Sequence, residues 1–441
     1  MTAFDALFVP AGLREATSGA SWLRAMLEVE RALAAAGAVA GIVPPASAEA
    51  IAEACGTPDA FSWSDLLDQG RAVGNPAEPL VRALRARVGG EHERFVHFGA
   101  TSQDVVDTAT MLVAREAIVH VLGYTDAAAD ACAVLARKHR DTPMAARTLL
   151  QQAVPTTFGL VAAGWLTALL DARARLAELA QTSLAVQLGG AAGTLAALGD
   201  AGPRVAEELA RALDLAVPTL PWHTNRVRVA ELGAALGTLA GVCGKLGLDV
   251  VLLSQTEVAE VREGAGGVSS TMPQKRNPVH ATLARACARL AQAHAAVLQE
   301  SLVSEHQRAA GAWHAEWEAF DGALAYAGGA AAAVTESLAG IEVDAARMRV
   351  NLDSGGGVVL SERVASVLAE RIGRDAAHEV VAGASASPAF REALLADSRS
   401  PLRADELDAL LDPVTYLGSA GAFVDRALAR YEAQTPTEGG S

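Results

Sequence analysis

The sequence predicts an all-α protein built around a long helical bundle. Apolar side chains recur at the three- and four-residue steps of a helix along most of the chain, and few stretches show the alternation that marks a strand. Apolar residues make up 51% of the 441 residues, whereas aromatic residues make up only 4%. Ala and Gly do much of the filling, and this composition favours closely packed helices over an aromatic-rich β sandwich.

The first clear helical pattern covers residues 21–36. Trp22, Met26 and Val29 follow one another at steps of four and three residues, which places them on one helix face. Gly37 comes directly after this pattern, and glycine is the usual residue at a helix C-terminus. We therefore expect the helix to end there.

A second helix is predicted to begin after Asn277. Asparagine is a favoured N-cap, and Pro278 would occupy the first helical position, where a missing N–H costs nothing. Leu283 and Leu290 then follow at a seven-residue step. The pattern predicts a helix that runs to about Leu302.

Two interruptions divide the helical pattern into three parts. The segment HFGATSQD at residues 97–104 precedes a long predicted helix, and three glycines at residues 355–357 form the clearest later break. We predict an N-terminal helical domain (1–109), a central long-helix bundle (110–354) and a C-terminal helical domain (355–441). Bundle helices without charges over some twenty residues should bury more surface than a monomer supplies, which favours an oligomer.

The charge balance argues against a nucleic-acid partner. The chain has 36 Lys and Arg against 51 Asp and Glu, which gives a formal net charge of −15. Nucleic-acid-binding proteins need an excess of positive charge to displace counterions from phosphates. A small anionic substrate remains compatible with this charge, because a few local cations outweigh a distant acidic surface.

The cysteines and the N-terminus favour a reducing, cytoplasmic location. The start of the chain lacks the basic and apolar segments of a signal peptide. An uncharged stretch at residues 148–170 contains polar side chains that are costly in lipid, so we expect a buried bundle helix there and no membrane span. Dispersed cysteines without a CxxC pair suggest neither disulfides nor zinc; they are Cys55, Cys132, Cys243 and Cys287.

The segment EGAGGVSSTMPQKRNP at residues 263–278 has the composition of a catalytic loop. Its glycines permit motion, Ser269 and Ser270 offer hydroxyl groups, and Lys275 supplies a positive charge just before a helix N-terminus. Such a loop could close over an anion and bring a proton-transfer group to it. The alternative is a surface loop with an ordinary helix cap.

Part of this loop, GVSSTMPQKRNP, resembles the signature loop of the fumarase/aspartase superfamily, GSSxMPxKxNP. Val268 departs from the pattern, since a glycine is usual there. Residues 97–109 and 147–159 are similar to the first and second conserved regions, so the resemblance covers essentially the whole chain. It implies a long helical bundle flanked by smaller helical domains, and a homotetramer whose active sites each combine segments of three subunits. It also implies catalysis without a cofactor or metal ion.

The resemblance also implies roles for individual residues. Ser269 matches the general base, Lys275 the residue that stabilises an aci-carboxylate intermediate, and Asn277 a carboxylate-binding asparagine. The remaining matches are substrate-binding positions: Thr101, Ser102, Thr148, Gln151, Ser270, Arg308 and, more weakly, Arg226. For His97 two roles stay open, either orienting the loop of Thr101 or lying in the site.

Leu149 is the departure that bears on the substrate. Superfamily members that expel an amine or water have a histidine at this position, which protonates the leaving group, and leucine cannot do so. A carboxylate or nitrite leaves without an acid. Residues 147–159 and 311–317 look most like the branch that cyclises 3-carboxy-cis,cis-muconate to γ-carboxymuconolactone in bacterial protocatechuate breakdown. The resemblance therefore implies a cycloisomerase; the alternatives are a lyase that eliminates nitrite from a nitrosuccinate, and a non-catalytic helical oligomer.

Overall fold

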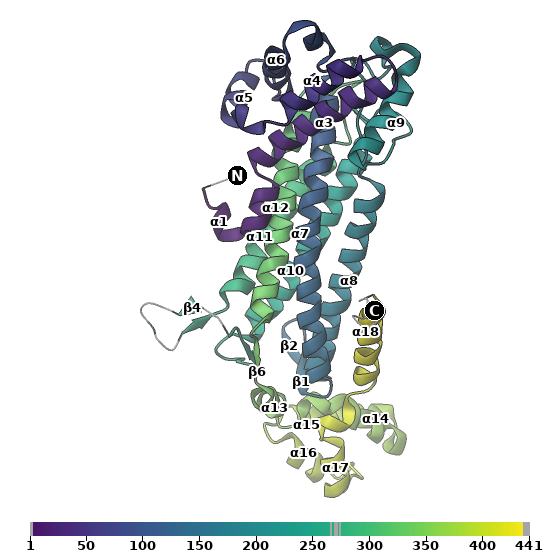
Figure 1. The fold of residues 1–441 in the computed structure, drawn as a ribbon. Helices are drawn as coiled ribbons and strands as arrows, with labels where there is room; N and C mark the ends of the chain where they lie inside the picture. The colour runs from purple at the N-terminus through teal and green to yellow at the C-terminus, as the bar shows by residue number, and fades with distance from the viewer. Residues whose placement is uncertain (1–2, 265–266, 269–271, 273–274, 435–441) are drawn as a thin grey trace, which may run out of the picture. The chain divides into compact units, whose positions relative to one another are not determined.

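The computed structural model describes residues 3–264, 267–268, 272 and 275–434, and it confirms the all-α fold (Figure 1). The chain forms two compact units, each assembled from three separate segments. Unit 1 comprises Met1–Asp126, Asp171–Lys245 and Leu283–Ala333. Unit 2 comprises Ala127–Leu170, Leu246–Thr282 and Val334–Ser441. The division into residues 1–109, 110–354 and 355–441 stays a prediction.

Long helices contribute to both units. They are α7 (Ser102–Lys138), α8 (Phe158–Thr182), α10 (Val227–Leu253), α11 (Val279–Glu300) and α12 (Ala312–Leu338). Shorter helices complete unit 1: α1 (Asp5–Phe8), α2 (Ala11–Ala16), α3 (Gly19–Val39), α4 (Pro45–Cys55), α5 (Trp63–Gly70), α6 (Ala77–Val88) and α9 (Gly202–Leu213). Within unit 1, α7, α10, α11 and α12 run side by side (Figure 1).

Glycines let α10 and α11 approach closely in unit 1. A Cβ atom at Gly233 would lie 2.7 Å from Cδ1 of Leu298, and one at Gly244 would lie 2.7 Å from Cβ of Ala288. Gly237 and Gly241 lie between them on the same helix and face α11 in the same way. Ala and Gly thus fill this interface, as the composition predicts.

The helix predicted at residues 21–36 is α3, but Gly37 does not end it. The helix continues to Val39, and Gly37 is buried inside it. A Cβ atom at Gly37 would lie 2.6 Å from Cγ2 of Val43. Glycine is present here because the following chain packs against the helix backbone, a tertiary reason that the local pattern does not reveal.

Unit 2 contains short antiparallel strand pairs and the C-terminal helices. The pairs are β1 (Pro143–Thr148) with β2 (Gln151–Thr157), β3 (Val261–Arg262) with β6 (Glu342–Val343), and β4 (Gly267–Val268) with β5 (Arg276–Asn277). The helices are α13 (Ala345–Asp353), α14 (Ser361–Ile372), α15 (Arg374–Ser385), α16 (Phe390–Ala396), α17 (Ala404–Leu410) and α18 (Ala420–Gln434). Leu368, Phe390 and Leu407 belong to a hydrophobic cluster among these C-terminal helices.

The uncharged stretch at residues 148–170 is not one helix. Its first part forms the turn of a hairpin and strand β2, and α8 begins only at Phe158. Of the described residues, only α10 has a length and hydropathy that would allow it to cross a membrane. Half of its most apolar window is buried inside the chain, and a core helix has the same composition.

Candidate active site

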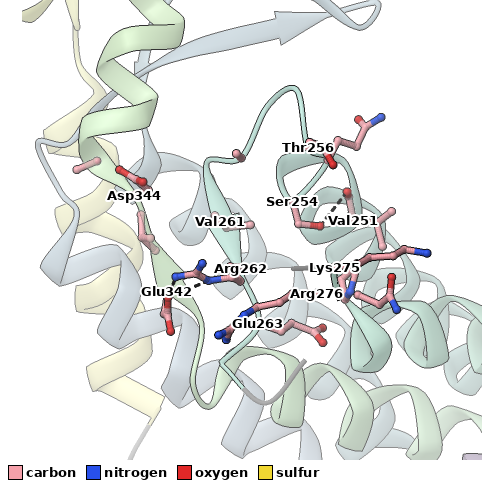
Figure 2. Close-up of a pocket in the computed structure, with 16 residues that line it drawn as sticks. Val251, Ser254, Thr256, Val261, Arg262, Glu263, Lys275, Arg276, Glu342 and Asp344 are labelled. Carbon is pink, nitrogen blue, oxygen red and sulfur yellow. Dashed lines mark hydrogen bonds and ion pairs between the residues drawn. The ribbon is translucent and has the colours of Figure 1, made fainter. Parts of the chain in front are cut away.

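A cavity of about 750 Å³ in unit 2 contains the described part of the predicted signature loop (Figure 2). Lys275 and Asn277 both line it, so the structure brings these two predicted site residues together. Arg262 of β3 and Glu342 of β6 also line the cavity and form an ion pair with each other, with 3.0 Å between Nε and Oε2. Lys275 is exposed and has no carboxylate partner among the described residues. Its charge is therefore available to an anionic ligand.

Two predicted site residues of the same loop, Ser269 and Ser270, lie outside the described residues. The backbone beside them is placed by β4 and β5, in which Val268 pairs with Arg276 and Gly267 with Asn277. Their roles stay predictions from the sequence.

Helix α11 begins differently from the prediction. Asn277 lies in β5, and the carbonyl of Pro278 accepts the first helical bond from the N–H of Thr282 at 3.1 Å. The cap comes from Glu263, whose buried carboxylate accepts from the N–H groups of His280 (3.1 Å) and Ala281 (2.8 Å). A carboxylate at the positive end of a helix is electrostatically favourable. Glu263 thereby joins the two ends of the loop.

The predicted residues Thr148 and Gln151 flank the tight turn of the β1–β2 hairpin. The two turn residues, Leu149 and Leu150, have φ values of +51° and +65°. Their side chains are 95% and 74% exposed. Leucine in the left-handed region is strained, and such strain often accompanies function. The hairpin therefore presents two apolar side chains at its tip, and neither Thr148 nor Gln151 lines the 750 Å³ cavity.

A buried ion pair holds this hairpin in unit 2. Arg147 donates from Nη1 and Nη2 to the two carboxylate oxygens of Glu260 at 2.9 and 2.7 Å. Asn351 of α13 donates to the same carboxylate at 2.8 Å, and Gln152 donates to the backbone carbonyl of Asn351 at 3.1 Å. This network fastens β1 and β2 to the segment that leads into β3.

In unit 1, Thr101 and Ser102 open helix α7, as the sequence predicts. The N–H of Thr101 donates to Oδ2 of Asp104 at 3.0 Å, which satisfies a backbone group at the helix start. The same carboxylate accepts from the N–H groups of Gly189 (3.0 Å) and Gly190 (2.9 Å). Asp104 therefore ties the Thr101 loop to a glycine-rich segment far away in the sequence.

Arg308 reaches this same cluster. Its guanidinium donates to the backbone carbonyls of Gly190 (3.3 Å) and Ala191 (3.0 Å) and, at 3.4 Å, to Oε1 of Gln103. These acceptors are neutral, and no ion pair of Arg308 with a carboxylate occurs among the described residues. The structure thus brings Arg308 close to the helix start of Thr101 with its charge uncompensated.

Arg226 requires a correction. It is only 2% exposed, and its guanidinium donates to Asp107 (2.8 and 3.1 Å) and Glu316 (2.9 Å from Nε). Burial opposes its charge, but these two carboxylates together raise its pKa. Burial also raises the pKa of Glu316, although Arg226 acts in the opposite direction. Because its donors are used internally, Arg226 holds helices together and does not contact a ligand from this position.

Sequence reasoning missed the acidic residues that organise these segments. Asp104, Glu260 and Glu263 are all buried, and each orients a segment that the motifs had identified. Asp104 is part of the first motif, and its position three residues after a Thr N-cap is typical of a capping box. The partners of Glu260 and Glu263 come from distant segments, so no local signal points to them.

Comparison with known proteins places this geometry in a family. A family profile described as "Lyase" matches residues 11–292. A second profile, described as "Adenylosuccinate lyase C-terminus", matches residues 357–427.

The chain belongs to the lyase family of the fumarase/aspartase superfamily. It is 46% identical to 3-carboxy-cis,cis-muconate cycloisomerase of Bradyrhizobium diazoefficiens, over 97% of this chain and 98% of the relative. It is 47% identical to nitrosuccinate lyase of Streptomyces davaonensis, over 94% of this chain and 91% of that protein. The crystal structure of 3-carboxy-cis,cis-muconate lactonizing enzyme from Pseudomonas putida matches with a TM-score of 0.91 and 42% identity, covering 98% and 99% of the two chains.

The two sets of residues suit the chemistry of this lyase family. Removing a proton beside a carboxylate creates a doubly charged aci-carboxylate, which fixed cations and hydrogen-bond donors must stabilise. Unit 2 supplies Lys275 and Asn277 in one cavity. Unit 1 supplies Arg308 and the hydroxyl groups of Thr101 and Ser102. An arginine fork matches a carboxylate in geometry as well as in charge.

Proposed function

We propose that the chain is a cofactor-independent cycloisomerase that interconverts 3-carboxy-cis,cis-muconate and γ-carboxymuconolactone. The observation that carries this proposal is that relatives at 46% and 44% identity, matched over nearly the whole chain, are named for this reaction. The apolar tip of the β1–β2 hairpin agrees with it, because Leu149 supplies no acid there. In the reverse direction the lactone opens by expelling an internal carboxylate, which is weakly basic and leaves without protonation. The 46% identity to a 3-carboxy-cis,cis-muconate cycloisomerase and the 42% identity to a 3-carboxy-cis,cis-muconate lactonizing enzyme support the same reaction.

The reaction balances without an external reagent. In the lactonising direction, a substrate carboxylate oxygen forms a C–O bond to one carbon of a double bond. The electron pair of that double bond moves toward the carbon beside a second carboxylate and produces the aci-carboxylate. Ser269 then delivers its hydroxyl proton to that carbon, and in the opposite direction its alkoxide removes the proton. A serine alkoxide needs a nearby cation, and Lys275 is the candidate on the same loop.

The remaining roles follow from the same proposal. Lys275 stabilises the charge that develops on the intermediate, and Asn277 donates an amide hydrogen bond to the substrate carboxylate. Other substrate carboxylate and backbone contacts come from Thr101, Ser102, Thr148, Gln151, Ser270 and Arg308. Arg226 is not part of this set, because its guanidinium is buried between Asp107 and Glu316.

A cytoplasmic homotetramer with active sites shared among three subunits is part of the proposal. Helix α10 supports an assembly, because it has no charged residue between Glu231 and Lys245 and its own chain buries only half of its most apolar window. The four cysteines are free and buried, in keeping with a reducing compartment. Light scattering should give about four times the 45.2 kDa chain mass.

A second candidate function is elimination of nitrite from nitrosuccinate. The 47% identity to a nitrosuccinate lyase favours it, and nitrite, like a carboxylate, leaves without an acid. Leu149 is therefore compatible with both reactions and does not separate them.

The deciding experiment offers both substrates to the purified protein. Loss of the conjugated-diene absorbance with 3-carboxy-cis,cis-muconate, together with no nitrite release from nitrosuccinate, is the expected result. Nitrite release with an inert muconate would select the second candidate, and inertness toward both would reject the two together. S269A should abolish turnover while leaving the circular dichroism spectrum unchanged, because the substitution removes only the proton-transfer hydroxyl.

A further inference from the structure

A second cavity, of about 370 Å³, lies beside the start of α7 in unit 1. Ser102 and His97 line it together with Arg82, Arg85 and Glu78 of α6. Arg82 is already paired with Glu78, at 3.2 Å between Nη1 and Oε2. The cavity therefore contains one predicted substrate-binding residue and a histidine that the mechanism above does not use.

His97 is held against a buried carboxylate. Its Nδ1 lies 2.6 Å from Oε1 of Glu30, a residue of α3 that is 1% exposed. Oε2 of Glu30 has no hydrogen-bond partner among the described residues. A positively charged partner stabilises a buried carboxylate of this kind. The Glu30 contact uses Nδ1 of His97, no described hydrogen bond uses Nε2, and the residue lines the cavity.

Charged groups on three helices act on this imidazole. Burial lowers the pKa of His97, but Glu30 of α3 and Asp104 of α7 raise it by more, and Arg85 of α6 opposes them weakly. The net pKa is raised, so the imidazolium persists to higher pH than in a free histidine. Glu78 and Arg82 largely compensate each other, since they form an ion pair.

The backbone at His97 restricts the direction of its side chain. His97 has a φ of +61°, in the left-handed region that residues other than glycine rarely adopt. Such a conformation persists only where surrounding contacts enforce it, and it is concentrated at functional sites. The Glu30 contact and the start of α7, five residues later, supply that enforcement.

We propose that His97, oriented by Glu30, binds one substrate carboxylate as an imidazolium beside Thr101 and Ser102. The inference rests on the proposed function and refines it, because it assigns a third cation, besides Lys275 and Arg308, to a substrate with three carboxylates. Glu30 is a positioning residue in this arrangement, since it acts only through His97.

The pH dependence of KM tests the assignment. In the wild-type protein KM should be low below the raised pKa of His97 and should rise as the pH passes through it, because the neutral ring loses its charge. E30Q removes the main group that raises this pKa, so the inflection should move to lower pH. A structural role for Glu30 would change stability or kcat without moving the inflection.

Removal of the ring should weaken binding directly. H97N is the suitable variant, because asparagine tolerates the left-handed backbone. A charge-assisted hydrogen bond contributes about 1.5–3 kcal/mol, so KM should rise on the order of 10- to 100-fold. H92Q is the matched control. His92 lies in the same unit, but its ring contacts Ser47 and takes no part in the His97–Glu30 pair. The KM of H92Q and its pH profile should therefore match those of the wild type.

Calorimetry gives a readout that does not depend on turnover. Propane-1,2,3-tricarboxylate should bind H97N more weakly than the wild-type protein by a similar factor, whereas the affinity for succinate should fall by less. Equal losses for the two ligands, or an unchanged KM in folded H97N, would overturn the role of His97. If the wild-type protein turns over neither muconate nor nitrosuccinate, the proposed function fails, and the tricarboxylate titration still decides whether His97 binds a carboxylate.

Discussion

Lys275 is exposed in the 750 Å³ cavity, and no described carboxylate compensates its charge. K275M should reduce kcat by about 10²–10³, because the aci-carboxylate loses a preorganised cation. The fold should be unaffected, since the side chain makes no described internal contact. Diene absorbance measures the rate. K138M, which removes an exposed lysine at the end of α7, should retain wild-type kcat; an equal loss in both variants would contradict a specific role for Lys275.

At the scale of single residues, the sequence identified charges but not their surroundings. Lys275 and Arg308 were predicted, and the structure gives neither a described carboxylate partner; Lys275 lines the 750 Å³ cavity, and Arg308 lies near the start of α7. Arg226 was predicted by the same reasoning and is instead buried between two carboxylates. The difference depends on which distant acidic residues pack nearby. Glu30 is hidden from sequence analysis for the same reason, because its partner His97 lies 67 residues away.

The β1–β2 hairpin is an element whose turn sequence conflicts with its backbone. Two leucines occupy positions with φ above +50°, where Asn-Gly is the preferred pair. L149N/L150G should therefore raise the free energy of unfolding by about 1 kcal/mol, because each leucine is strained there. Urea unfolding measures this change, and kcat should fall in the same variant if the apolar tip serves the reaction. An unfolding midpoint at or below that of the wild type would show that the turn is not strained.

Helices and strands were predicted well where the local periodicity of apolar residues determines them, and poorly where a residue far away in the sequence stabilises them. The pattern over residues 21–36 found α3, and the Asn-Pro pair found α11 to within two residues. The Asn-Pro pair did not reveal that Glu263 caps α11, because that residue precedes the helix by sixteen residues. The strands β1 and β2 were missed as well. Their alternation is weak, and Arg147–Glu260 pairing, together with packing against α13, stabilises them instead.

For the whole molecule, sharing of active sites between subunits predicts complementation. S269A and R308M should each be inactive, since one removes the loop hydroxyl of unit 2 and the other a cation of unit 1. If a site takes these two segments from different subunits, random mixing of equal amounts leaves about one quarter of sites intact. Refolding the mixture and measuring diene loss tests this. The control is a mixture of S269A with K275M. Both changes lie on one loop, so no intact site can form and no activity should return. If activity returns in neither mixture, the two segments of a site come from the same chain.

The close approach of α10 and α11 has a consequence for how this sequence can vary. Gly233, Gly237, Gly241 and Gly244 each face side chains of the neighbouring helix, and glycine inside a helix costs roughly 1 kcal/mol relative to alanine. Four such residues make this segment a weak helix former by itself. Its order therefore depends on its neighbours, and natural drift at these four positions is confined to the smallest side chains.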